Sequence, residues 1–117
     1  MKVNINNAGT RYTLLEDCVF PLWNITVPTN FITDLATIPK FLWSVYPPAG
    51  YYQHAAILHD YLYTLHHMGE DACDRKEADR RFRVQMKADG VGIRTCWTFW
   101  LAVRLFGGIY WNRKASF

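Results

Sequence analysis

The residues best suited to chemistry lie in residues 54–67, a segment that holds all four histidines of the chain. His59 is followed directly by Asp60, and Tyr63 lies one helical turn further along. His59 also shares a helical stripe with the apolar residues at positions 55, 58 and 62. An imidazole with a carboxylate beside it can act as a general base near neutral pH or as a metal ligand. The alternative is a core histidine that is held by hydrogen bonds and takes part in no reaction.

A second carboxylate, Asp79, is expected on the buried flank of the following helix. The apolar stripe of that helix consists of Ala78, Phe82 and Met86. Burying a carboxylate is costly unless it meets a hydrogen-bond donor or a cation. Because the turn between the two helices is short, they should pack as antiparallel neighbours. We therefore predict that Asp79 lies within hydrogen-bond reach of His59, with Asp34 nearby.

The elements that position these residues follow from composition and periodicity. β-branched and aromatic residues punctuated by proline predict short antiparallel strands at 11–20 and 23–27, and a strand end that runs into a loop at 30–39. Helices are expected at 40–46, 52–67, 74–89 and 93–106. The sequence thus predicts an α+β fold, with N-terminal strands, an antiparallel helix pair and a C-terminal aromatic helix.

The second long helix carries clear signals at both ends. Asp74 is a suitable N-cap, and Glu77 three residues later completes a capping-box pattern. Gly90 can adopt the left-handed conformation that ends many helices. The apolar run of the helix expected at 93–106 is interrupted by Arg104 and is too short for a bilayer span. We expect no transmembrane segment.

Length and cysteine content limit the class of protein. The 117 residues are enough for one core, so we expect a single domain, 1–117. The three cysteines include no CxxC pair, which argues against a disulfide framework or a zinc knuckle and favours a reducing compartment. The first residues lack an apolar run, so no signal peptide is expected.

Charge is distributed unevenly along the chain. Residues 1–74 carry three basic and seven acidic side chains, whereas residues 75–117 carry ten basic and three acidic ones. A solvated helix face explains most of the basic residues between 75 and 87. Because that basic helix is interrupted and no base-reading module accompanies it, we expect no nucleic-acid partner.

Four blocks of the sequence, taken in order, resemble a family of small uncharacterised proteins of tailed bacteriophages and prophages. The blocks are FITDLATIP at 31–39, AAILHDYLY at 55–63, KEADRRF at 76–82 and AVRLFG at 102–107. One departure is Asn30, where the family pattern leads us to expect glycine. Asparagine tolerates positive φ better than most residues, so the turn can be kept. The resemblance implies a phage origin and no particular activity.

The helix pair also resembles the core of secreted phospholipases A2. By that resemblance His59 would be the general base, Asp79 would orient it, and Tyr63 would support the pair. Asp60 would bind a divalent cation, calcium or zinc, with Asp34 supplying a further oxygen. The glycine-rich calcium loop and the disulfides of those enzymes are absent from this sequence.

Two classes of function therefore remain open. The first is a phage-encoded, non-catalytic or vestigial-site protein that assembles with other virion proteins of the tail or capsid through its aromatic C-terminal segment. It would act in the host cytoplasm during assembly and then in the virion. The second is a small metal-assisted hydrolase with a His59–Asp79 dyad, phospholipase-like or directed at the cell envelope.

Overall fold

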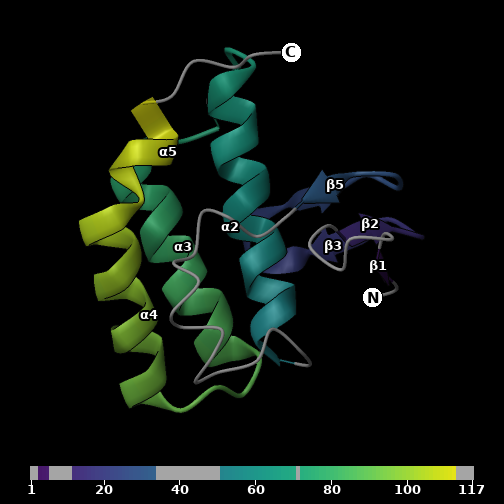
Figure 1. Cartoon of the computed structure of the whole chain (residues 1–117). Coiled ribbons are helices and arrows are strands. Elements are labelled where there is room, and N and C mark those ends of the chain that lie inside the picture. The colour runs from purple at the N-terminus through teal and green to yellow at the C-terminus, as the bar shows by residue number, and fades with distance from the viewer. Residues whose placement is uncertain (1–2, 6–11, 34–50, 71, 113–117) are drawn as a thin grey trace. The chain divides into compact units, whose positions relative to one another are not determined.

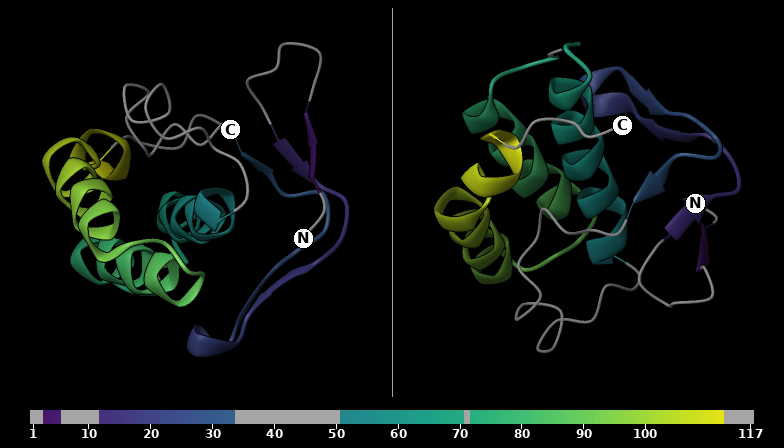
Figure 2. Two further views of the ribbon diagram at one scale, coloured as in Figure 1. Left: turned by 90° about the horizontal axis from the view of Figure 1, so that it is seen from below. Right: turned by 45° about the horizontal axis from the view of Figure 1, so that its top comes forward.

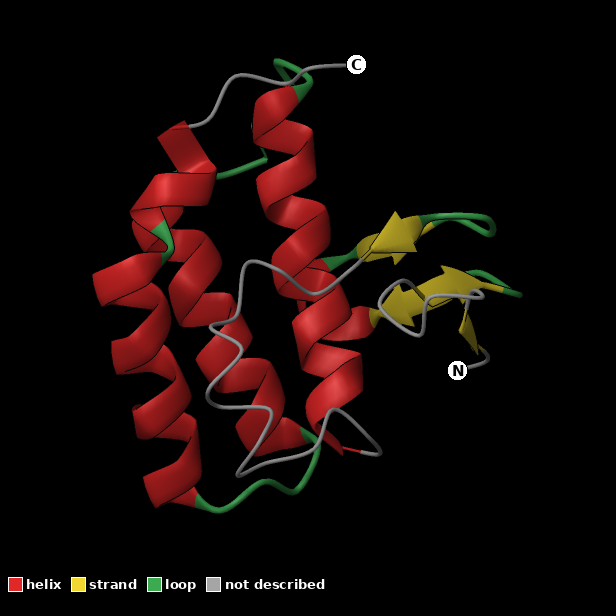
Figure 3. Ribbon diagram, in the orientation of Figure 1, coloured by secondary structure: helices red, strands yellow, loops and turns green. Residues whose placement is uncertain are grey.

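The structure is a computed structural model. Its described part consists of short antiparallel strands followed by helices (Figures 1 and 3). The described residues are 3–5, 12–33, 51–70 and 72–112. They divide into two units, residues 1–36 and residues 37–117. The predicted α+β fold is confirmed. The expected single domain stays a prediction, and the expected helix at 40–46 lies outside the described residues.

The N-terminal unit contains two small sheets. Strands β1 (Val3–Ile5), β2 (Tyr12–Leu14) and β5 (Ile32–Thr33) form an antiparallel sheet in the order β1-β2-β5. Strands β3 (Cys18–Phe20) and β4 (Ile25–Val27) form a separate antiparallel pair. Alternate residues of β3 are buried and exposed, as expected for the period of two in a strand.

The expected strand at 11–20 is wrong as a single element, because a bend separates β2 from β3. At this bend the Asp17 carboxylate accepts hydrogen bonds from the backbone N–H and the hydroxyl of Thr29, both at 2.7 Å. This side-chain bonding competes with strand pairing. The expected strand at 23–27 starts later, since Pro21–Trp23 forms a 3-10 turn. Asn30 has φ of +72°, which confirms the prediction that asparagine can replace glycine there.

The second unit is helical. Its elements are α2 (Tyr51–His67), α3 (Arg75–Ala88), α4 (Ile93–Phe106) and the short α5 (Gly108–Asn112). Helix α3 packs against both α2 and α4, and the three run alternately up and down (Figure 1). Helix α5 turns back to contact α2, as the second view in Figure 2 also shows. The expected antiparallel pair, α2 and α3, is therefore present.

The ends of α3 follow the predicted signals. Asp74 is the N-cap, and its carboxylate accepts the backbone N–H of Glu77 at 2.8 Å. The Glu77 carboxylate pairs instead with Arg80 and Arg81, so the observed cap is one half of the capping box. Gly90 has φ of +98°, a left-handed conformation that glycine adopts without steric cost.

The predicted stripes of α2 and α3 are buried. Ala55, Leu58 and His59 on α2 have no exposed surface, and Tyr63 is 1% exposed. The α3 stripe and Asp79 are equally inaccessible. Helix α4 contributes Cys96, Phe99 and Val103 to the buried set. The polar residues His59, Tyr63 and Asp79 thus lie among apolar side chains and must be satisfied there.

Candidate functional site

Asp79 lies at the centre of a hydrogen-bonded cluster inside the helical unit. His59 and Tyr63 are four residues apart on α2, so they share a face of that helix. The Oδ1 atom of Asp79 lies 2.7 Å from Nε2 of His59 and accepts the Tyr63 hydroxyl at 2.7 Å. The predicted contact between His59 and Asp79 is confirmed.

The second oxygen of Asp79 is also bonded, and sequence reasoning missed its partner. Oδ2 accepts Nη1 of Arg104 on α4 at 2.8 Å, and Nη1 of Arg75 lies 3.6 Å away. In the sequence, Arg104 interrupts the apolar run of α4 and lies in the block at 102–107. A cation inside such a run was the available signal, because a half-buried guanidinium in an apolar helix needs a carboxylate.

Arg75 connects the start of α3 to the end of α4. Its Nη1 donates to the carbonyl oxygens of Val103 at 3.2 Å and Arg104 at 3.4 Å. These carbonyls belong to the last turn of α4, and the Val103 oxygen also accepts the backbone N–H of Gly107 at 2.8 Å. Asp79, His59, Tyr63, Arg75 and Arg104, which we call the Asp79 network, therefore join α2, α3 and α4.

Gly107 allows the chain to pass close to this network. A Cβ at this position would lie 2.7 Å from the Tyr63 hydroxyl oxygen and 2.4 Å from the carbonyl oxygen of Val103. Both distances are shorter than side-chain atoms tolerate, so only glycine fits without displacement. The same residue closes the block at 102–107 in the sequence.

The network fixes the charge state of its carboxyl and its phenol. Burial by itself would raise the pKa of Asp79, but the hydrogen bonds from His59, Tyr63 and Arg104 outweigh burial and hold that pKa below its usual range. Burial and the neighbouring Asp79 charge raise the pKa of the Tyr63 phenol. Asp79 is therefore a carboxylate and Tyr63 a neutral donor at neutral pH. Since a carboxylate only accepts, Nε2 of His59 carries the hydrogen in their shared bond.

This arrangement restricts what His59 can do chemically. With Nε2 donating to Asp79, His59 could accept a proton from a substrate or water only at Nδ1. The imidazole has no exposed surface and lies between the rings of Tyr63 and Phe82, with centroid distances of 4.3 and 4.8 Å. A general base must come within hydrogen-bond distance of the proton it removes. The described geometry therefore positions the imidazole but does not present it to solvent.

The expected cation ligands are only partly described. Asp60 follows His59 in α2 and is 8% exposed. A step of one residue turns a helix by about 100°, so Asp60 faces a different side from His59. Asp34 lies outside the described residues. Among the residues that the structure describes, no group of three His, Cys, Asp or Glu side chains could hold a metal ion. The roles of Asp60 and Asp34, and the catalytic roles of His59, Asp79 and Tyr63, stay predictions.

A second polar contact joins the start of α2 to the end of α3. Nδ1 of His54 lies 2.7 Å from Oδ2 of Asp89, and the Gln85 amide donates to Oδ1 of Asp89 at 2.9 Å. Asp89 is the C-cap residue of α3. Sequence reasoning did not assign a partner to either His54 or Asp89. Two of the four histidines thus bond to carboxylates of α3 or its cap.

A family model described as protein of unknown function (DUF1353) matches residues 12–103. The chain belongs to the DUF1353 family. The matched region contains His59, Tyr63, Arg75 and Asp79 and ends one residue before Arg104. No curated protein and no solved structure matches the chain. In the part of the chain that is described, every helix is too short or too polar to cross a membrane.

Proposed function

We propose that this protein is a non-catalytic component of a bacteriophage particle, in which it assembles with other virion proteins. The closed Asp79 network is the observation that supports a non-catalytic role. Both carboxylate oxygens of Asp79 are bonded, and the imidazole beside them is fully buried. A fully satisfied buried polar network specifies one packing of its helices. A protein that must fit a fixed place in an assembly benefits from such a core.

The arginines weigh against catalysis at this site. A carboxylate assists a catalytic histidine by stabilising the imidazolium that forms during the reaction. Arg104 at 2.8 Å and Arg75 at 3.6 Å already neutralise the charge of Asp79. A proton arriving on His59 would add a third positive charge to this buried cluster. The network is therefore better suited to holding three helices together than to accepting protons.

Phage origin and the place of action rest on the four sequence blocks at 31–39, 55–63, 76–82 and 102–107. Their order and spacing resemble small proteins of tailed phages and prophages. On this proposal the protein acts in the host cytoplasm during assembly and is then part of the virion.

The aromatic C-terminal segment supports a partner in that assembly. Trp97 is 45% exposed and Phe106 is 44% exposed. Trp111, in contrast, is stacked on His66 at 3.8 Å and meets the edge of Tyr63 at 5.0 Å. Aromatic residues are enriched at the centres of protein interfaces. We therefore assign contact with partners to α4 and treat Trp111 as part of the helical unit's own packing.

Mass spectrometry of purified particles tests this proposal. A phage whose copy of the gene is disrupted would be complemented by the parent protein, by Asp79→Asn or by Trp97→Gln. We expect the parent protein in stoichiometric amounts, and reduced incorporation of both variants. Glu70→Gln, a change in the turn after α2, serves as the control and should be incorporated normally. Absence of the parent protein from intact particles would refute the proposal.

The His59–Asp79 distance of 2.7 Å supports a second candidate, the small metal-assisted hydrolase. In that case calcium or zinc would bind at Asp60 and Asp34, and His59 would activate water. The test is ester hydrolysis by the purified protein. Hydrolysis that depends on the added cation, and that His59→Ala abolishes while the variant stays folded, would favour the hydrolase over the assembly protein. Equal background rates for the parent and the variant would eliminate it.

A further inference from the structure

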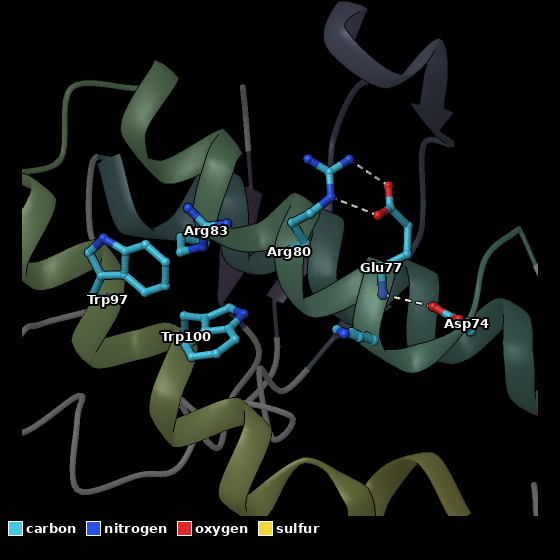
Figure 4. A pocket seen from close by; sticks show the side chains of 7 residues that line it. Asp74, Glu77, Arg80, Arg83, Trp97 and Trp100 are labelled. Carbon is cyan, nitrogen blue, oxygen red and sulfur yellow. Dashed lines mark hydrogen bonds and ion pairs between the residues drawn. The ribbon is translucent and has the colours of Figure 1, made fainter.

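A groove between α3 and α4 combines cationic and aromatic side chains (Figure 4). It encloses about 380 Å³ and is lined by Lys76, Arg80 and Arg83 from α3 and by Trp97 and Trp100 from α4. The two indoles meet edge to face with their centroids 5.3 Å apart. Such a surface offers flat apolar contact area together with positive charge at its border.

The carboxylates along this groove are already engaged. Asp74 caps α3, and Glu77 is paired with Arg80 and Arg81 at 2.7 and 3.0 Å. The Arg83 guanidinium lies over the Trp97 ring at 4.1 Å. Its Nε atom is buried and has no hydrogen-bond partner among the described residues. Arg83 is therefore held in place on Trp97, where its positive charge lines the groove.

Beside the groove, α4 carries a continuous apolar stripe. The stripe consists of residues spaced by four, each about half exposed or more: Ile93 (47%), Trp97 (45%), Leu101 (52%) and Leu105 (67%). At about 100° per residue these positions lie within an arc of about 120°, and they extend about 18 Å along the helix. Cys96, Phe99 and Val103 occupy the buried side of the same helix. Single exposed apolar residues are ordinary, but a stripe of four marks a contact surface.

We infer that the α4 stripe and the adjoining groove bind an acidic, amphipathic helical segment of another protein. Apolar side chains of the partner would cover Trp97, Leu101 and Leu105, and a carboxylate at its edge would reach Arg83. This is the helix-on-groove mode of recognition, in which anchors recur every three or four residues. The inference deepens the proposed assembly function, since it names the surface and the chemistry of the partner.

The charges favour an acidic partner over a second copy of the chain. Arg94 is exposed beside Ile93 at the start of the stripe, and residues 75–117 carry ten basic against three acidic side chains. Two such faces laid together would bring like charges into contact, which costs free energy at an interface. Nucleic acid is the poorer fit, because the aliphatic side chains of Ile93, Leu101 and Leu105 provide no stacking surface for bases.

The test uses the full-length protein and a synthetic amphipathic peptide of about 18 residues, with leucine along one face and glutamate along its flanks. Its control has the same leucines and lysine in place of glutamate. Binding is measured by fluorescence anisotropy at about 50 mM salt and again at higher salt. We expect the acidic peptide to bind at least about tenfold more tightly than the basic one, with affinity falling as salt rises.

Three variants locate the site. Leu101→Gln should weaken binding of the acidic peptide by about tenfold, as expected for loss of a central anchor. Arg83→Gln should weaken it several-fold and reduce its salt dependence. Met68→Gln is the matched control, because Met68 is 54% exposed but lies in the turn after α2. It should bind like the parent. Circular dichroism and melting of each variant confirm that it is folded.

Several results would overturn the inference. These are equal binding of both peptides, no binding of the acidic peptide, and an unchanged affinity of Leu101→Gln. Tighter binding of a single-stranded oligonucleotide at this groove would assign the surface to nucleic acid. A dimer in sedimentation that Leu101→Gln abolishes would assign it to a second copy. Particle incorporation is measured separately. The peptide-binding inference can therefore fail while the assembly function holds, and the assembly function can fail while the peptide still binds.

Discussion

Replacing Asp79 by asparagine removes the charge of the Asp79 network with almost no change in shape. The asparagine oxygen can still accept from His59 and Tyr63, but the new amide group meets the donors of Arg104. The charge-assisted bond at 2.8 Å is therefore lost. Bonds to charged groups contribute about 1.5–3 kcal/mol to stability. The two remaining bonds weaken when their acceptor is neutral, by about 1 kcal/mol together. We predict a loss of about 3 kcal/mol in the free energy of unfolding.

Urea unfolding followed by tryptophan fluorescence measures this loss. For a small protein the free energy of unfolding falls by about 1.5 kcal/mol per molar urea, so the midpoint should decrease by about 2 M. Glu77→Gln is the matched control. It also removes a carboxylate paired with two arginines on α3, but Arg80 is 47% exposed and Glu77 30% exposed. Exposed pairs contribute about 1 kcal/mol or less.

A double-mutant cycle assigns the effect to the contact with Arg104. Arg104→Met keeps most of the aliphatic stem and removes the guanidinium. The cycle with Asp79→Asn should give a coupling energy of about 1.5–3 kcal/mol, because the two side chains are in direct contact. The reasoning is refuted if Asp79→Asn unfolds within about 0.5 kcal/mol of the parent, or if the two effects simply add.

Three further predictions concern the same network. Tyr63→Phe should lower the free energy of unfolding, measured in urea, by about 1 kcal/mol, since Asp79 loses one hydrogen bond and keeps its other partners. A decrease above about 3 kcal/mol would contradict this. Because the native pKa of Asp79 is depressed, its stabilisation is complete above the unfolded value near pH 4 and declines as pH falls through the native pKa. Urea midpoints measured from pH 5 down to pH 2 should therefore fall more steeply for the parent than for Asp79→Asn, and parallel curves would show that Asp79 is not the titrating group. Gly107→Ala should lower the free energy of unfolding by about 1–3 kcal/mol, because the alanine methyl group would lie 2.4 Å from the Val103 carbonyl oxygen. An unchanged urea midpoint would mean that the backbone there shifts without cost.

The sequence was sufficient to predict the helix pair and its central contact because the signals are local. The stripe around His59 and the stripe beside Asp79 each have helical spacing, and Asp74 and Gly90 mark the ends of α3. A short turn leaves two such helices few ways to pack. The antiparallel arrangement then placed the imidazole and the carboxylate at the same level, 2.7 Å apart.

The parts that sequence reasoning missed are non-local. Arg104 meets Asp79 across 25 positions, and only the packing of α4 against α3 selects that carboxylate among all the acids of the chain. Likewise, the bend at Asp17 depends on Thr29, twelve residues away. Periodicity identified which residues are buried. It did not identify which distant partner satisfies each buried polar group.

The Asp79 network and the α4 stripe are connected through Arg104 and Arg75. Arg104 holds α4 to α3 through Asp79, while Arg75 binds the carbonyl groups at the end of α4. The groove is bounded by the same two helices, so its shape depends on the bonds that join them. A hydrolase would need His59 to reach a substrate, which the fully buried ring does not do. The proposed assembly role requires that α4 be held in one position; the network joins α4 to α3 while Ile93, Leu101 and Leu105 stay exposed.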